Sequence, residues 1–263
     1  MTKRNLARLA ALSLACAATI TATSCAQVRR LYKHYFPDEY DPAALTVDVT
    51  EAGTLTVPDM SAGEILDYFC DVALDSEYGE TEHRVCRWES PISYTVEGAA
   101  TDEDLALIAE LCDRLNEIDG FPGIRKAIIA QTANFTVSFV PREEIPGMFT
   151  SADENCVGMA EYSWDVETGE ILSARAAITA DLTDERESTI CEEFLQSLGP
   201  ANDSYEHIDS VFYEGRTLVP RPSKLDWAVL ALLYSPKLTT GADKKTAMVQ
   251  AAGVVAWNEE ETK

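Results

Sequence analysis

The chain has 263 residues, of which 46% are hydrophobic and 25% are charged, so it can bury a sizeable core and has the composition of a soluble globular protein. It carries 45 acidic and 21 basic residues, which give a formal net charge of -24. A surface of this charge repels the phosphates of DNA and RNA, which excludes a nucleic-acid-binding function. An acidic surface that keeps the protein in solution is the simplest reason for the charge.

The N-terminus has the pattern of an export signal. Three basic residues precede an apolar stretch, residues 9–23, that is too short to cross a bilayer as a helix. Small residues follow at the predicted cleavage site. We therefore predict a signal peptide over residues 1–24 and an extracytoplasmic location for the rest of the chain.

Residues 22–25, Ala-Thr-Ser-Cys, resemble the lipobox of bacterial lipoproteins, in which the cysteine becomes the lipidated first residue. This resemblance implies a lipid anchor at Cys25 that holds the protein on the extracytoplasmic face of the cell membrane. An ordinary secretory signal, and hence a secreted protein, is the alternative. Residues 25–60 are predicted to be the anchor and a tether, because prolines and aspartates interrupt any helix there.

Two amphipathic helices are predicted at the start of the folded region. Ser61 and Glu64 have the spacing of a capping box, and the apolar residues after them recur at helical intervals to about Gly79. A second helix is expected to begin at Thr101, with Asp104 three residues further on. Its spacing predicts the buried residues Leu105, Ile108, Ala109, Cys112 and Leu115.

Strands are predicted where aromatic and aliphatic residues alternate between turn residues. Residues 85–96 are typical of a strand that is entered through a proline turn. Residues 133–140 place their aromatic residues on one face of a second strand. Residues 157–166 and 170–180 have the pattern of a hairpin.

The C-terminal third is predicted to contain three helices. The N-terminal caps that we expect are, in chain order, Thr183 or Asp184, Ser223 with Asp226, and Thr240 with Asp243. This order of elements predicts one α+β domain over residues 61–258, in which a small twisted mixed sheet is backed by helices. Residues 259–263 are expected to be a frayed tail.

Five cysteines follow Cys25, so at least one of them is free or bonded to another chain. None has the Cys-x-x-Cys spacing of a structural zinc site or a redox dithiol. Cys70, Cys112 and Cys191 fall among apolar residues of predicted helices. We favour buried thiols for these three over disulfides.

A series of short motifs occurs in order between Cys70 and about Gly241. The motifs are Glu77-Tyr78-Gly79, Arg87-Trp88-x-x-Pro91-Ile92, Asn116-x-Ile118-x-Gly120-Phe121-Pro122-Gly123, Ala133-Asn134, Glu192-Glu193-x-x-Gln196-x-Leu198-Gly199-Pro200-x-Asn202-Asp203 and Leu232-Leu233-Tyr234-x-Pro236. Together they resemble a bacterial lipoprotein family called domain of unknown function 2927. That family has no assigned activity, so the resemblance implies a family and leaves the function open.

Residues 192–203 are also similar, more distantly, to the His-Glu-x-x-His-x-x-Gly-x-x-His helix and turn of the metzincin zinc peptidases. Residues 133–139 resemble the edge-proximal strand of that family, residues 210–213 its methionine turn, and residues 225–234 its closing helix. The resemblance implies a zincin-like or metzincin-like fold with a cleft along the helix.

The metzincin resemblance assigns positions but not the usual residue types. Glu192, Gln196 and Asn202 stand at the three metal-ligand positions, Glu193 stands at the general-base position, and Phe212 replaces the methionine. Two imidazoles one helical turn apart grip zinc together, whereas amide oxygens are weak zinc ligands. Oxygen donors suit calcium or magnesium better.

Asp203, His207 and Tyr213 complete the set of residues that we expect near this cleft. Each candidate also has an ordinary interpretation. Glu192 and Gln196 have the spacing of a hydrogen-bonded pair, and Glu193 is also explained as a solvated or network carboxylate. The remaining candidates are ordinary residues of turns.

No histidine stands at any of the three metal-ligand positions. This favours a non-catalytic protein that binds a peptide, a glycan or a protein partner in the cleft, with no cofactor expected. A metal-dependent, peptidase-like hydrolase is the alternative. It would hold a divalent cation, zinc or calcium, with Glu192 and Asp203 and with His207 or Tyr213 as a further ligand, and Glu193 would act as its base. A third hypothesis is a calcium site that only stiffens the domain.

Overall fold

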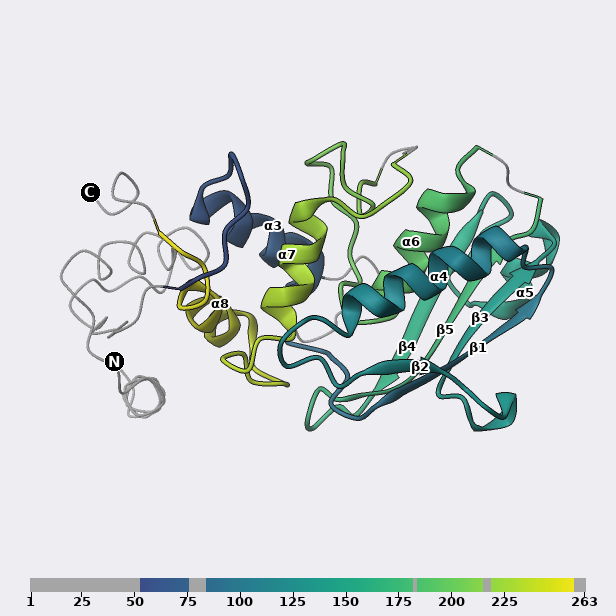
Figure 1. Cartoon of the computed structure of the whole chain (residues 1–263), viewed down its shortest axis with the longest axis horizontal. Coiled ribbons are helices and arrows are strands. Elements are labelled where there is room, and N and C mark those ends of the chain that lie inside the picture. Colours follow the sequence, from purple (N-terminus) through teal and green to yellow (C-terminus); the bar gives the residue numbers. More distant parts are fainter. Residues whose placement is uncertain (1–52, 76–83, 182–183, 215–218, 258–263) are drawn as a thin grey trace.

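The structure is a computed structural model that describes residues 53–75, 84–181, 184–214 and 219–257 (Figure 1). The predicted signal peptide, the anchor at Cys25, most of the tether and the tail lie outside these ranges. Within the described ranges, no helix is both long and apolar enough to cross a membrane.

Five strands form one mixed sheet. They are β1 (Ile92–Gly98), β2 (Ile124–Lys126), β3 (Phe135–Val140), β4 (Gly158–Trp164) and β5 (Ile171–Thr179), in the spatial order β2-β1-β3-β5-β4. Every neighbouring pair is parallel except β4 and β5, which are antiparallel. The predicted hairpin is therefore confirmed, and β2 and β4 are the two edges of the sheet.

The register of the central strands places apolar side chains on one face. Phe135 of β3 lies opposite Ala174 of β5, and Val137 lies opposite Ala176. All four are buried, because α4 (Asp102–Leu115) and α6 (Arg186–Gln196) cover this face. The centre of the Phe135 ring lies 5.0 Å from that of Phe194 on α6.

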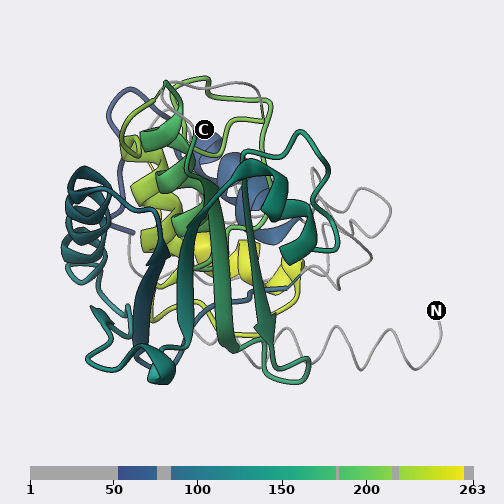
Figure 2. The ribbon, with the colours of Figure 1, turned by 90° about the vertical axis from the view of Figure 1, so that its right-hand side faces the viewer.

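The opposite face of the sheet is covered mainly at one end, by the short η3 (Arg142–Glu144) and α5 (Ile145–Met148) (Figure 2). Ile145 and Phe149 pack there against Ala177 of β5. The large helices thus all lie on the α6 side of the sheet.

Three further helices extend the core beyond the sheet. α3 (Ala62–Leu74) packs against α7 (Lys224–Leu233) and α8 (Lys244–Ala252), at the left of Figure 1. Leu55 also exchanges backbone hydrogen bonds with Val254 and Ala256, so the two ends of the described chain lie together.

The helix starts were predicted well where a capping box marks them. The boxes at Ser61, Thr101 and Ser223 are all present, and each side chain accepts a hydrogen bond from the backbone three residues later. The start of the last helix was wrong, because Asp243 rather than Thr240 caps α8. The first helix was expected to run to about Gly79, but it ends at Leu74, because the backbone of its C-cap residue Asp75 is extended.

Other expectations are corrected. The segment 85–96 is not one strand: β1 begins only at Ile92, and Arg87 makes an isolated bridge to Glu170. In α4, Leu107 and Leu111 are buried in place of Leu105 and Ala109, because the apolar stripe faces α6 at a different angle. The short strand β2 was not predicted, since three residues carry no periodicity.

The five cysteines of the described residues are all free. Cys70, Cys112 and Cys191 are buried in α3, α4 and α6, which confirms the prediction of buried thiols. Burial raises the pKa of Cys191 to about 12, so its thiol stays protonated and is no nucleophile.

Candidate functional site

The candidate site is built on α6, which runs beneath the edge strand β4. The helix begins at Arg186, and its N-cap residue, Glu185, makes no capping bond with its side chain. The expected cap was therefore wrong for Asp184, and Thr183 lies outside the described residues. The guanidinium of Arg186 instead fixes this end, by donating to the carboxylate of Asp104 and to the Ala180 carbonyl.

The side chain of Glu193, a residue of α6, lies between the helix and β4, and Glu193 is only 6% exposed. A Cβ atom at Gly158 would lie 2.4 Å from Oε1 of Glu193 and 2.5 Å from the methyl group of Thr189. The glycine therefore lets the carboxylate lie directly against the edge strand. Glu193 is thus a buried carboxylate and not a solvated one, which leaves the network carboxylate of the two ordinary interpretations.

Cys156 lies just before β4 on the same side. Its thiol donates to the carbonyl of Gly158 at 2.7 Å. Burial, and then the nearby charge of Glu193, raise the pKa of Cys156 to about 11. The Cys156 thiol is therefore neutral beside the Glu193 carboxylate, and no thiolate is available here for catalysis.

Gln196 and Asp203 meet where the chain returns after the helix. The amide Nε2 of Gln196 donates to Oδ1 of Asp203 at 2.6 Å. Glu192 lies one turn earlier on the same half-buried side of α6. The structure therefore brings Asp203, not Asn202, to the part of the helix where the third ligand was expected.

Asn202 has a structural part instead. Its amide Nδ2 donates to the backbone carbonyls of Asp71 and Asp203, both at 2.9 Å, and its own N–H donates to the Val72 carbonyl at 3.2 Å. These bonds fasten the turn to the end of α3. An amide used in this way holds the chain in place rather than a metal ion.

Gly199 allows the chain to leave α6 at a sharp angle. Its φ of 129° lies in the region that glycine favours, and a Cβ atom would lie 2.4 Å from the Cys86 carbonyl oxygen. The helix itself ends at Gln196, with Ser197 as its C-cap, and Gly199 then turns the chain both because of its φ and because of its close approach to the Cys86 carbonyl.

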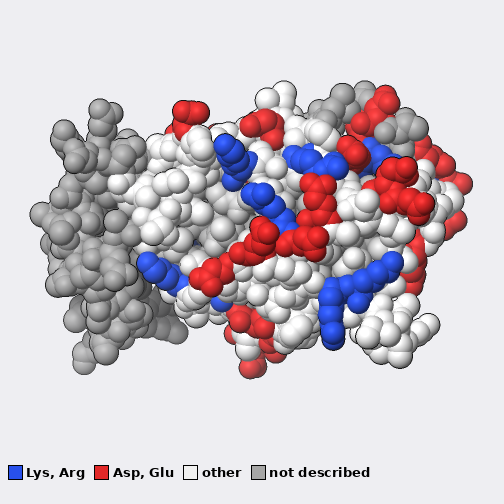
Figure 3. All heavy atoms as spheres, viewed as in Figure 1, with Lys and Arg blue, Asp and Glu red and all other residues white. Residues whose placement is uncertain are grey.

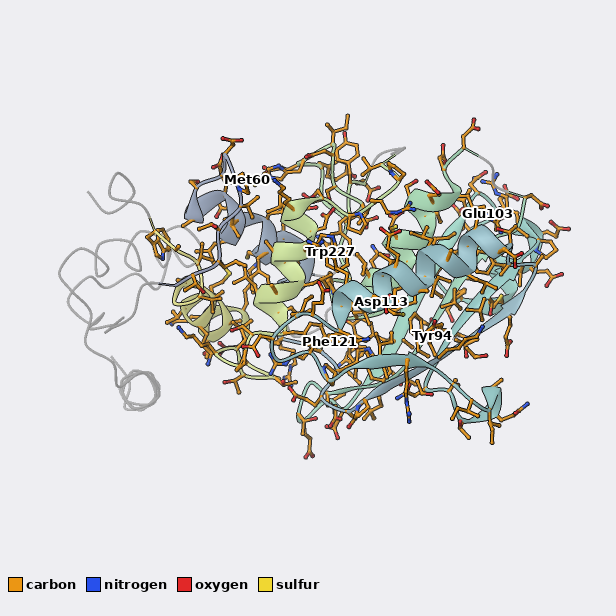
Figure 4. The ribbon with its side chains drawn as sticks, in the orientation of Figure 1. Met60, Tyr94, Glu103, Asp113, Phe121 and Trp227 are labelled. Carbon is orange, nitrogen blue, oxygen red and sulfur yellow. The ribbon has the colours of Figure 1, made fainter. Side chains whose placement is uncertain are left out.

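Three aromatic side chains satisfy the carbonyls at this helix end, which the sequence reasoning missed. Trp88 Nε1 donates to the Ser197 carbonyl at 3.0 Å, the Tyr234 hydroxyl to Leu198 at 2.7 Å, and the Tyr162 hydroxyl to Gly199 at 3.3 Å. The centre of the Phe121 ring lies 4.7 Å from that of Tyr234, the C-cap residue of α7. Figure 4 shows Phe121 near this end of the helix. Tryptophan and tyrosine carry a polar group at the end of an apolar ring and usually find a hydrogen-bond partner when buried, so these residue types were the signal in the sequence for such bonds.

The turn after the site, residues 210–213, rests on a buried polar network. Ser210 Oγ hydrogen-bonds with the Tyr68 hydroxyl and donates to Oδ1 of Asp226 at 2.5 Å. The backbone N–H groups of Val211 and Ser223 donate to Oδ2 of the same carboxylate. Burial raises the pKa of Asp226. The network joins the turn to α3 and α7.

The two cleft candidates near this turn, His207 and Tyr213, are both half-buried. The ring of His207 meets that of Tyr68 edge to face, with the centres 4.9 Å apart, and its φ is 58°. Tyr213 is half-buried and bridges Ser204 in the backbone. Phe212, which replaces the methionine of the metzincin pattern, is fully buried.

Among the described residues, no group of three or more His, Cys, Asp or Glu side chains could hold a metal ion. The site is therefore a row of polar side chains along α6, from Glu192 through Gln196 to Asp203, beside the free edge of β4. Its chemistry is that of a hydrogen-bonding, negatively charged surface.

The family comparison covers this whole arrangement. A model of the family DUF2927, described as protein of unknown function, matches residues 62–251, from α3 to α8. Neither a curated protein nor a solved structure matches the chain. Since the match spans well over half of the chain, and agrees with the motifs of the sequence, the chain belongs to the DUF2927 family of proteins of unknown function.

Proposed function

We propose that this protein is a non-catalytic binding protein that holds an extended peptide along the open edge of β4. It is exported and anchored through Cys25 at the extracytoplasmic face of the cell membrane, and its domain is a metzincin-like fold without peptidase chemistry. The observation that carries the proposal is the free edge of β4 beside the polar side of α6.

The hydrogen-bonding pattern identifies the free groups of this edge. The N–H of Thr179 donates to the Val157 carbonyl at 2.9 Å, so these two residues are a hydrogen-bonded pair between the segments of β5 and β4. In an antiparallel pair such bonds recur at every second residue, which directs the backbone of Ala160 and Tyr162 away from β5. An extended peptide could add to those groups as a further strand.

The surroundings of the edge favour a basic ligand. Glu192 is a carboxylate of α6, which packs against β4, and Asp203 is a carboxylate of the following turn that meets Gln196 of α6. Tyr162 of β4 reaches the Gly199 carbonyl in the same turn. Lysine or arginine side chains of a bound peptide would complement these charges. The order of α6, the Gly199 turn, the buried Phe212 turn and α7 supports the metzincin-like assignment. The strand at residues 133–139 does not, because it was expected near the edge and is β3 in the middle of the sheet.

A substitution at the edge tests the proposal. The purified protein is panned against a displayed library of random peptides, and the selected peptides are titrated by fluorescence anisotropy. Ala160→Pro removes an outward N–H and fills its place with a ring, while edge strands tolerate proline there. We expect affinity to fall at least about fivefold, because a backbone hydrogen bond is lost and approach is blocked.

Ala160→Ser is the matched control, since it keeps the N–H and nearly the same volume. Its affinity should equal that of the unchanged protein. Thermal melts of both variants show whether the sheet is intact. Failure to select any peptide, or equal affinity of Ala160→Pro and Ala160→Ser, would sink the proposal.

The hydrolase with an oxygen-rich metal site is the second candidate. It is favoured by one observation, the approach of the Asp203 carboxylate to Gln196, one turn from Glu192. In that case Glu193 would be the base. Glu193→Gln would then abolish any peptidase activity that a substrate screen finds, whereas unchanged turnover excludes Glu193 as the base.

A further inference from the structure

A projecting loop after β2 combines exposed isoleucines with basic residues. Ile128 is 95% exposed and Ile129 is 57% exposed. Arg125 and Lys126, the last two residues of β2, are separated from them only by Ala127 and are also exposed. We call residues 125–132, which end in the single turn η2 (Ala130–Thr132), the β2–β3 projection (Figure 1). Every one of its residues is exposed except the half-buried Ala127.

The charge of this region is opposite to that of the rest of the chain. Between Asp119 and Glu143 the sequence holds no acidic residue but three basic ones, Arg125, Lys126 and Arg142. With 45 acidic residues in 263, a stretch of this length would ordinarily contain several. Figure 3 shows basic side chains at the lower right beside a protrusion without charged atoms.

The sheet holds the projection in its outward position. The N–H of Ala127 donates to the Tyr94 carbonyl at 2.7 Å, and the N–H of Asn134 donates to the Ser93 carbonyl at 2.9 Å. Within the loop, the N–H and hydroxyl of Thr132 both donate to the Ile129 carbonyl. Both ends of the loop are therefore fixed to β1, and the isoleucines are presented to solvent by a defined turn.

We propose that the β2–β3 projection docks on an anionic lipid bilayer. Ile128 and Ile129 enter the boundary between headgroups and acyl chains, and Arg125 and Lys126 lie at the level of the headgroups. Two side chains on a convex tip are too small for a stable protein interface, which needs about 800 Å² on each partner. Such a tip suits a bilayer, which closes around it.

The net charge of -24 repels an anionic surface, but that repulsion is screened beyond about 8 Å at physiological ionic strength. The domain therefore approaches with its basic projection nearest the lipid. Since β2 and β4 are opposite edges of the sheet, this orientation turns the β4 edge away from the bilayer. The proposal stands independently of what β4 binds.

Hydrogen exchange measured by mass spectrometry tests the docking. The full chain is incubated with vesicles of phosphatidylcholine alone, or of phosphatidylcholine mixed with phosphatidylglycerol. We expect the amides of residues 128–131 to exchange about fivefold more slowly with the anionic vesicles. Neutral vesicles should give little slowing, and added salt should reverse it.

Variants separate the contributions of charge and apolar contact. The double variants R125E/K126E and I128S/I129S should both lose the slowing, and both should fold, because these side chains are exposed. The matched control is Ile208→Ser, because Ile208 is 71% exposed but lies beside Asp209 rather than beside basic residues. It should keep the slowing.

Equal exchange with and without anionic vesicles overturns the proposal. So does slowing that persists in R125E/K126E. Slowing that depends on protein concentration without vesicles would assign the loop to contact with a second copy of the chain, and would also overturn it.

Discussion

Asp226 is a carboxylate with no exposed surface, and it lies where three elements meet. It accepts hydrogen bonds from the Ser210 hydroxyl and from two backbone N–H groups. The Ser210 hydroxyl also hydrogen-bonds with Tyr68 and so links Asp226 to α3. A buried carboxylate is costly unless such donors surround it. This residue therefore fixes the turn beneath the candidate site, and its loss should be felt throughout the domain.

We expect Asp226→Ala to lower the free energy of unfolding by about 3 kcal/mol, because several buried donors lose their acceptor. The matched control is Asp243→Ala, which removes the exposed N-cap of α8 and should cost only about 1 kcal/mol. Urea unfolding of both variants measures the difference. Equal losses would contradict the importance given to the network.

The pH dependence of the same residue can also be tested. Its folded-state pKa is raised by burial, so its contribution to stability is complete below its unfolded pKa, about 3.9, and is lost as pH rises through the folded value. Compared with Asp226→Asn, the unchanged protein should therefore be relatively most stable near pH 4 and lose that advantage toward pH 7. A constant difference over this range would refute the shift.

At the scale of elements, the junction of α6 with the following turn determines the geometry of the candidate site. Gly199 approaches the Cys86 carbonyl, and aromatic donors from three segments satisfy the last carbonyls of the helix. The direction in which Asp203 returns to Gln196 depends on this junction. Hydrogen bonds thus connect the end of α6 to β4, through Tyr162, and to the end of α7, through Tyr234.

Gly199→Ala should destabilise the protein by about 3 kcal/mol or more, since neither the φ of 129° nor the backbone contact can relax easily. Gly147→Ala is the control: no atom lies within 4 Å of a Cβ there, so its stability should change by less than about 0.5 kcal/mol. Thermal melts of both variants provide the comparison. A neutral Gly199→Ala would show that the turn is not constrained in this way.

At the scale of the whole molecule, the sheet separates two surfaces. Its β4 edge carries the acidic side of α6, and its β2 edge carries the basic projection. The hydrogen bonds of Gln196 and Asn202 complete the polar site without an ion. We therefore predict that the stability of the domain does not depend on a bound cation.

Removing divalent cations should leave the melting temperature unchanged, and elemental analysis of the dialysed protein should find no stoichiometric metal. A resident ion would stabilise the folded state by mass action, so a chelator would then lower the melting temperature. Stoichiometric zinc or calcium with such a fall would favour the hydrolase or the calcium hypothesis instead. As a control for effects of the chelator itself, the melt is repeated with chelator that is already saturated with magnesium. This melting temperature should equal the one measured without chelator.

The sequence by itself determined the features that depend on residues close together in the chain. The capping boxes at Ser61, Thr101 and Ser223 are bonds between residues three apart, and the β4–β5 hairpin follows from adjacent alternating segments. The buried thiols followed from helical spacing, and the family from ordered motifs. Local geometry and local composition are sufficient for all of these.

Only the tertiary structure decided which polar groups meet. Glu193 is buried because Gly158 of β4 leaves room for it, and Asp203 rather than Asn202 reaches Gln196 because of how the turn is fastened to α3. The Tyr68 and Ser210 hydroxyls meet although they are 142 residues apart. Such contacts depend on how distant segments pack, and no spacing within one segment encodes them.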